Sequence, residues 1–385
     1  MSKGDSQPTY PTCFGPYLRY AIATEFENFE FFRGEFALFF LVEFRKAGLA
    51  DKFGSEMNRI GLPVKFGPTV EDPAHMRYST MFASRSAVTE PDAISQDGLP
   101  TWKEIWEEHV SRIELSLPLK SPLKPPFARM GLVRRWEEGK HRAGKLLIGM
   151  MDDGCPFAAA QFLTRRSANT PLTTRVRGIW DQNEGKHPVS VAVGANASRP
   201  FGHTPPDFQY GVEFSRDFNP PLGPEIGLDE WIDRHLMPTG SIDEDGCYAD
   251  AEFTNLASRQ SHGAHVMDVL AGRLPLSSRI GPSKPGYDRR DPPSWLPADP
   301  ATDPACGIKT DLVFVQFARK CIRDATGVWL LAYVEQGIQY ILSFAEPHRT
   351  EKVIINLSYG PTTGPHDGTA LLEARLTALI GPVRM

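Results

Sequence analysis

The chain has 385 residues, of which 41% are hydrophobic and 23% are charged. This length and balance allow a large buried core and indicate a globular protein, for which two domains are the usual arrangement. The formal net charge of -5 argues against nucleic acid or an anionic membrane as the main partner, because a weakly acidic surface attracts neither.

Targeting signals and a disulfide framework are also missing from the sequence pattern. The first 16 residues have no apolar core of signal-peptide length, and no later segment approaches the ~18 apolar residues of a membrane-spanning helix. The five cysteines are scattered and include no C-x-x-C pair, which is typical of a reducing compartment. We therefore expect a cytoplasmic protein with no cofactor and no metal centre.

Residues 1–143 are predicted to form a smaller α+β region without chemistry of its own. Residues 36–42 are an apolar run that predicts a buried strand. Residues 102–115 place Trp102, Ile105 and Trp106 at helical spacing and predict an amphipathic helix. The proline-rich residues 116–129 cannot continue a helix or a central strand and are expected to be a linker.

The stretch KLLIGMMDDGCPF, residues 145–157, organises the rest of the chain. Its apolar run predicts a strand that is buried on both faces, as in a parallel sheet, and that delivers Asp152 to its carboxyl end. That edge is where open α/β sheets place their chemistry, and Gly154 permits a sharp turn there.

A histidine that such a carboxylate could orient lies in the stretch SHGAHV, residues 261–266. We predict a helix that begins near Ser261, has His262 in its first turn and carries Val266, Val269 and Leu270 on one face. A carboxylate that holds an imidazole prepares it to take a proton from a nucleophile, so Asp152 and His262 are candidates for an acid–base pair.

The pattern after residue 144 predicts an α/β domain with a doubly wound parallel sheet. Strands are expected at 174–180, 311–317 and 352–358, and helices at 328–344 and 368–379. A long insertion occupies residues 164–258, and within it residues 186–240 are expected to be irregular because they are rich in proline and glycine.

Three short motifs in this order, MMDDG, SHGAHV and INLSYG, resemble the motifs of the subtilisin-like serine peptidases, the subtilases. The resemblance covers roughly residues 144–380 and implies a partial subtilisin-like catalytic domain that cleaves extended polypeptides. It implies that Asp152 is the acid of an Asp-His-Ser triad and His262 its general base. It also implies that Ser358, Tyr359 and Gly360 form the strand that pairs with substrate, while His265 supports the helix.

The chain departs from this family at the nucleophile. The family places a serine and an oxyanion-hole asparagine well beyond the substrate strand, yet Met385 follows Gly360 closely, and the one similar stretch, Asp367 to Ala370, has alanine in place of serine. We therefore expect the chain alone to be inactive as a peptidase. A second chain or a missing C-terminal segment would supply the serine and the asparagine. The serine segment could be absent through truncation, a frameshift, processing or a split gene.

Several alternatives stay open. A metal-dependent hydrolase could use His262 and His265 with Asp152 or Asp268 as a third ligand, and Cys155 could act as a nucleophile with His262. A non-catalytic pseudopeptidase could bind peptides or regulate a partner chain. Residues 1–143 could be an accessory domain, or a propeptide-like segment such as many subtilases carry. The insertion could either cover the cleft or lie on the surface without contacting substrate.

Overall fold

The structure is a computed structural model that describes most of the chain. The described residues are 10–26, 36, 38–89, 100–116, 146–165, 172–183, 186–194, 197–208, 210–216, 225–238, 242–273, 310–319, 321, 330–346, 349–360, 365 and 367–380. The proposed proline-rich linker lies outside this set except for Ser116, which ends a strand.

The N-terminal region is built on a four-stranded antiparallel sheet in the order β2-β3-β1-β4. Its elements are α1 (Pro16–Ala23), β1 (Leu38–Phe44), α2 (Ala50–Arg59), β2 (Val64–Phe66), β3 (Tyr78–Ala83), α3 (Ser86–Thr89), α4 (Trp102–His109) and β4 (Val110–Ser116). A β-α-β-β-α-β succession runs through them, which is the split β-α-β arrangement. The buried strand expected at 36–42 is confirmed as β1, shifted by two residues.

The helix expected over 102–115 is wrong in its second half. The helix α4 ends at His109, and the chain continues directly as β4, which pairs with β1. The apolar residues Val110, Ile113 and Leu115 are all buried in the sheet. Two of these residues are β-branched and fit a pleated surface, so sheet pairing prevails over the helical spacing of the preceding tryptophans.

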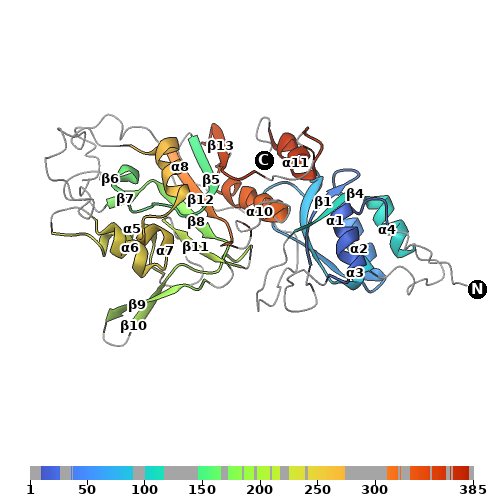
Figure 1. The fold of residues 1–385 in the computed structure, drawn as a ribbon, viewed down its shortest axis with the longest axis horizontal. Coiled ribbons are helices and arrows are strands. Elements are labelled where there is room, and N and C mark those ends of the chain that lie inside the picture. The colour runs from blue at the N-terminus through green and yellow to red at the C-terminus, as the bar shows by residue number, and fades with distance from the viewer. Residues whose placement is uncertain are drawn as a thin grey trace, which may run out of the picture.

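The second part of the chain contains a five-stranded sheet in the order β11-β8-β12-β5-β13 (Figure 1). These strands are β5 (Leu146–Asp152), β8 (Val176–Asp181), β11 (Val212–Ser215), β12 (Thr310–Gln316) and β13 (Lys352–Leu357). Neighbours among β8, β12, β5 and β13 pair in parallel, as expected, but β11 pairs with β8 antiparallel. The sheet is therefore mixed, which corrects the prediction of a purely parallel sheet.

The insertion is more regular than expected. A 3-10 helix (Ala160–Phe162) precedes it, and β6 (Leu163–Arg165) leads into it. The insertion then holds, besides β8 and β11, the elements β7 (Leu172–Thr174), β9 (Val189–Gly194), β10 (Ala197–Phe201), α5 (Leu228–Asp233), α6 (Glu244–Asp250) and α7 (Thr254–Ala257). The antiparallel pair β9 and β10 extends away from the main sheet (Figure 1). Short strands with proline and glycine between them explain why the composition suggested an irregular segment.

Helices lie on both faces of the five-stranded sheet. Side chains of β5 alternate between these faces, so that Ile148 and Met150 pack with Met267 of α8 (His262–Ala271), whereas Leu147 and Met151 pack with α10 (Leu331–Leu342). Helices therefore cover both faces of the sheet at β5.

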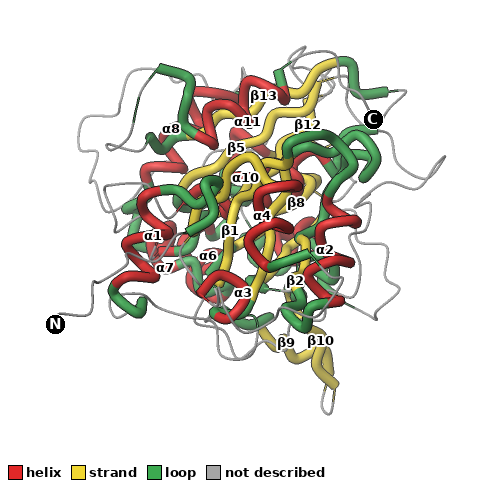
Figure 2. The backbone as a smooth tube through the Cα atoms, turned by 90° about the vertical axis from the view of Figure 1, so that its right-hand side faces the viewer, coloured by secondary structure: helices red, strands yellow, loops and turns green. Residues whose placement is uncertain are grey.

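The helix α10 is shared by the two parts of the molecule. It contacts β5 and β12 of one sheet and β1, β3 and β4 of the other, and Figure 1 shows it between the two sheets. In Figure 2, which is viewed from the side of the N-terminal region, α10 lies at the centre and overlaps β1 and β5. Every residue from Ala332 to Ile341 is buried. The last helix, α11 (Leu371–Leu379), lies beside the N-terminal sheet. The N-terminal region thus covers a helix of the α/β domain rather than standing apart from it.

Among the described residues, no helix has the length and apolar character that crossing a membrane requires.

Candidate active site

Asp152 is the last residue of β5 and lies at the carboxyl end of the sheet, as predicted. Its side chain is only 6% exposed, and its Oδ1 accepts a hydrogen bond of 2.7 Å from the backbone N–H of Asp153. Burial raises the pKa of Asp152, because desolvation disfavours the charged carboxylate, and the hydrogen bond to His262 opposes this rise. The carboxylate is held rigidly at the end of a central strand.

The residues that follow Asp152 join the strand end to the start of α8. The backbone oxygen of Asp153 accepts hydrogen bonds from the Gly263 N–H at 3.0 Å and from Ser261 Oγ at 2.6 Å. Its carboxylate oxygen Oδ1 accepts a second bond of 2.7 Å from the Gly263 N–H. Ser261 caps α8 by accepting from the Ala264 N–H at 3.0 Å. These bonds satisfy N–H groups that a helix start leaves unpaired.

Two glycines allow this close contact. Gly154 has a φ of +76°, a backbone conformation that favours glycine. Gly263 lies so close to Asp153 that a Cβ at this position would clash with the Asp153 backbone oxygen. The glycine that follows His262 is therefore required by the approach of α8 to the end of β5.

His262 is the first residue of α8, and its Nδ1 lies 3.0 Å from each carboxylate oxygen of Asp152. The imidazole is 64% exposed on its other side. The hydrogen bond to Asp152 raises the pKa of His262 above its ordinary value of 6.5. Because Nδ1–H donates to Asp152, the neutral ring carries its lone pair on Nε2, which is the nitrogen that a general base uses.

Ser358, Tyr359 and Gly360 leave the same edge of the sheet directly beside Asp152. They follow β13, which pairs with β5 in parallel, and the Ser358 N–H donates to the Met151 backbone oxygen at 3.2 Å. The Tyr359 ring packs edge-on against Phe317 with centroids 6.4 Å apart. The Ser358 hydroxyl accepts a bond of 2.6 Å from Asn356 Nδ2. The predicted substrate strand and the predicted acid–base pair thus share one sheet edge.

A cavity of 780 Å³ opens beside Asp153 and Gly154 at this edge. Its walls include Asp181 and Gln316 from the ends of β8 and β12, and the segment 249–256 of the insertion. The insertion therefore contributes to a space next to the acid–base pair instead of lying wholly on the outer surface.

A polar network that was not predicted from the sequence lies in this cavity and is centred on Asp181. The Asp181 carboxylate accepts from Asn183 Nδ2 at 2.6 Å and from Gln316 Nε2 at 2.9 Å, and Lys186 Nζ lies 3.5 Å away. The Lys186 ammonium also lies 3.4 Å from the centroid of the Phe253 ring. Burial raises the pKa of Asp181 and lowers that of Lys186, since it disfavours both charges. Asp181 is the last residue of a buried strand, as Asp152 is, and this position is the signal that could have revealed it.

The structure also bears on the alternative chemistries. Cys155 is fully buried, and burial raises the pKa of its thiol well above the ordinary value, which suits a packed side chain rather than a nucleophile. His265 lines a different cavity, together with Asp268. Among the described residues, the side chains that gather around His262 with spacing suited to a metal are Asp152 and Asp153.

Comparisons with family models, curated proteins and solved structures were then made for the whole chain. None of them found a match. The assignment of function therefore depends on the geometry of Asp152, His262 and the strand beside them.

Proposed function

We propose that this chain carries the acid and the general base of a serine endopeptidase of the subtilisin-like family. The observation that carries the proposal is the pairing of His262 Nδ1 with both oxygens of the buried Asp152 carboxylate at the carboxyl edge of the sheet. An imidazole held in this way can take a proton from a hydroxyl through Nε2, and the carboxylate then balances the charge of the imidazolium.

The neighbouring strand supports a polypeptide as the substrate. β13 is an edge strand in the described sheet, and Gly360 beyond it is exposed. An extended peptide can add its backbone to such an edge, so that main-chain hydrogen bonds give affinity and pockets near Tyr359 give specificity. A subtilisin-like fold is part of this proposal, since the acid strand and the proposed substrate strand are direct neighbours.

The nucleophile is proposed to come from another segment or a second chain. In the part of the chain that the structure describes, no hydroxyl group is hydrogen-bonded to His262 Nε2. Apolar side chains stand exposed on the same side of the sheet, at Val269 and Leu270 of α8 and at Ile354 of β13. Ile354 is opposite Ile148 in the register and therefore points toward the α8 face. A domain portion that brings the serine and the oxyanion asparagine would cover these side chains.

We also propose a cytoplasmic location and an accessory role for the N-terminal region. The described cysteines Cys13, Cys155, Cys247 and Cys321 are all buried and reduced, which suits a reducing compartment such as the cytoplasm. For the N-terminal region we favour an accessory domain that stays docked on α10, with a removable propeptide-like segment as the alternative.

Labelling with a fluorophosphonate tests the proposal. The protein purified in its native form, with any segment or chain that accompanies these 385 residues, should be labelled on serine, and the variants His262→Ala and Asp152→Asn should lose the label. The 385-residue chain alone should stay unlabelled. Label on the isolated chain that is lost in His262→Ala would show that a serine within these residues is the nucleophile, and would overturn the proposed source of the serine.

A non-catalytic peptide-binding protein is the second candidate, and the position of β13 at the edge of the described sheet favours it. If the native form is folded and unlabelled yet binds extended peptides, with binding lost in a Gly360→Pro variant, this candidate replaces the first. Proline at this position removes a backbone N–H that β-pairing requires.

A further inference from the structure

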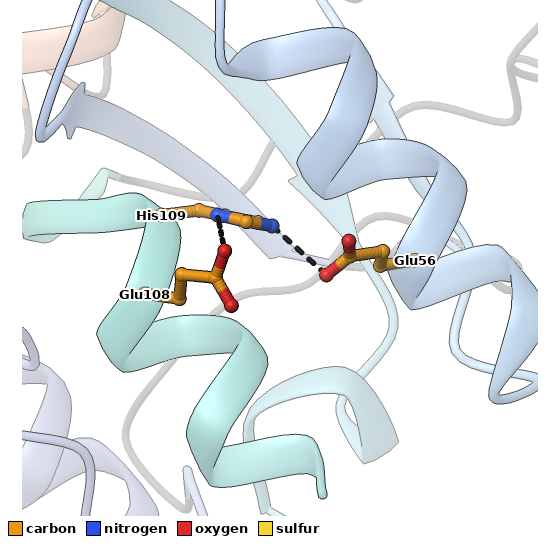
Figure 3. A group of neighbouring side chains, drawn as sticks. All are labelled: Glu56, Glu108 and His109. Atoms are coloured by element: carbon orange, nitrogen blue, oxygen red, sulfur yellow. Dashed lines mark hydrogen bonds and ion pairs between the residues drawn. The ribbon is translucent and has the colours of Figure 1, made fainter. Parts of the chain in front are cut away.

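A second group of potential metal ligands lies in the N-terminal region, far from Asp152 in sequence and outside the proposed peptidase site. It consists of Glu56 on α2 and of Glu108 and His109 at the end of α4 (Figure 3). One ligand atom from each of these residues lies within 4.8 Å of the other two. Lys52, one turn before Glu56, contacts both carboxylates.

The imidazole of His109 is buried, and only one of its two nitrogens has a hydrogen-bond partner. Its side chain is 1% exposed, and Nε2 lies 2.9 Å from Glu56 Oε2. The Phe53 ring packs edge-on against it, which fixes its plane. The other nitrogen, Nδ1, has no hydrogen-bond partner, although it is fully shielded from water. Buried polar atoms in this state are rare and call for an explanation.

Nδ1 faces the Glu108 carboxylate, as Figure 3 shows, and lies 3.9 Å from its Oε1. This separation is too long for a hydrogen bond. When Nε2–H donates to Glu56, Nδ1 carries a lone pair, so two electron-rich groups face each other across a gap. A cation between them would satisfy both.

The arrangement matches the way proteins hold a zinc-binding histidine. Such a histidine donates its second ring N–H to a carboxylate, which fixes the ring and makes the ligating nitrogen more basic. Zinc lies about 2.0–2.2 Å from nitrogen and oxygen ligands, so the gap of 3.9 Å between Nδ1 and Oε1 fits around one ion at an open angle. The Glu108 side chain is exposed and can adjust to a tetrahedral angle.

We propose that His109 Nδ1 and the Glu108 carboxylate bind a Zn²⁺ ion, that Glu56 orients the imidazole, and that water completes the coordination. The ion would be bound at the end of α4, and the contact between Glu56 and His109 Nε2 would link this site to α2. The cluster at His262 is different, because Nδ1 there is already bonded to Asp152, and the Asp153 carboxylate is bonded to the Gly263 N–H.

In the structure, the Lys52 ammonium is the cation that contacts both carboxylates. Its ammonium lies 2.9 Å from Glu108 Oε1 and 3.7 Å from Glu56 Oε1, and its side chain is 54% exposed. An exposed ion pair of this kind contributes little stability, so a divalent ion can displace it. Lys52 should therefore compete with zinc, and its removal should strengthen binding.

Calorimetric titration of the full chain with zinc chloride tests the site, in an Asp152→Asn, His262→Ala background that disables the other cluster. One equivalent should bind. Glu108→Gln, which changes an exposed side chain and spares the core, should abolish this binding. Glu56→Gln should weaken it about 10–100-fold, as the loss of an orienting carboxylate does elsewhere. Lys52→Met should strengthen it, and His75→Gln, an exposed histidine on the same region, should leave it unchanged.

A nitrogen-detected NMR spectrum tests zinc coordination directly. If His109 had only a structural role, its ring nitrogen resonances would not change when zinc is added. On addition of zinc, the Nδ1 resonance of His109 should shift while Nε2 keeps its proton. The proposal is overturned if neither the background chain nor its folded Lys52→Met form binds zinc. It is also overturned if Glu108→Gln and His109→Gln still bind zinc normally, or if the His109 resonances do not shift when zinc is added.

Discussion

Both carboxylate oxygens of Asp152 lie 3.0 Å from Nδ1 of His262, which is the first residue of α8. A helix N-terminus carries partial positive charge and disfavours a protonated imidazole, whereas a carboxylate at this distance favours it. The carboxylate prevails, because the pKa of His262 lies above its ordinary value of 6.5. The geometry of this pair therefore favours the protonated imidazole, as the proposed role of a general base requires.

Asp152→Asn should lower the pKa of His262, because the amide oxygen still accepts the Nδ1–H bond but carries no charge. In the wild-type protein, protonated His262 contributes stability that is present below pH 6.5 and is lost as the pH rises through its raised pKa. An NMR titration of the histidine ring protons measures this directly. Asp250→Asn is the matched control, because Asp250 lies 3.1 Å from Nε2 of a different histidine, His235. A His262 titration that is the same in Asp152→Asn and in the wild type would contradict the assigned cause.

Gly263→Ala should destabilise the chain and displace the start of α8. The added Cβ would clash with the backbone oxygen of Asp153, and backbone cannot rotate away as a flexible side chain can. Forced overpacking of this kind costs about 1–3 kcal/mol. Urea unfolding measures the loss, and Gly360→Ala is the control, since a Cβ there meets nothing within 4 Å. Equal stability of the two variants would mean that α8 does not depend on this close approach.

The strand that carries Asp152 and the helix that carries His262 were predictable, because each has a strong local signal. β5 is a continuous apolar run with a turn residue after it, and α8 begins at a serine cap. The buried face of α8 was harder to predict: Met267 is buried, whereas Val269 is exposed. That outcome depends on which neighbours cover the helix, and composition does not contain this information.

The features that sequence analysis missed depend on contacts between distant segments. The helical spacing does not predict β4, because β4 is stabilised by pairing with β1, which joins residues about 70 positions apart, as in Val42 with Ile113. The Asp181 network likewise joins the ends of two strands through Gln316. Spacing along the chain cannot reveal such pairs unless the topology is already known.

Arg375→Met should loosen the attachment of the N-terminal region. Arg375 on α11 is 2% exposed and binds two carboxylates, Glu335 on α10 at 2.9 Å and Glu71 of the N-terminal region at 2.7 Å. Removal of the guanidinium leaves both carboxylates without their cation, which for buried pairs costs about 3–5 kcal/mol. Limited proteolysis and urea unfolding should both show the loss.

The matched control is Lys103→Met, which breaks an exposed ion pair with Glu107 and should cost less than about 1 kcal/mol. Adding Glu71→Gln and Glu335→Gln to Arg375→Met should recover part of the loss, since it removes the unpaired charges. If Arg375→Met unfolds like the wild type, the docking of the N-terminal region does not depend on this ion pair.

Glu114→Gln should make the chain more stable at alkaline pH and leave it unchanged in acid. The Glu114 carboxylate packs against Gly15, and burial raises its pKa to about 7 from an ordinary 4.5. Below pH 4.5 the carboxyl group is protonated in both the folded and the unfolded chain, so its raised pKa costs no stability there. Between pH 4.5 and 7 only the unfolded chain releases the proton, and stability falls by about 3 kcal/mol in total.

Glutamine cannot ionise, so the variant should lack this fall. Urea unfolding of the variant and the wild type at pH 4.5 and at pH 8 gives the difference in the free energy of unfolding at each pH. Glu104→Gln is the control, for which the effect of pH should have the opposite sign. The Glu104 carboxylate is exposed and accepts hydrogen bonds from Thr101, which lower its pKa, so its contribution is present above pH 4.5 and is lost in acid. A Glu114→Gln variant that follows the wild-type pH dependence would show that Glu114 keeps its charge in the folded chain.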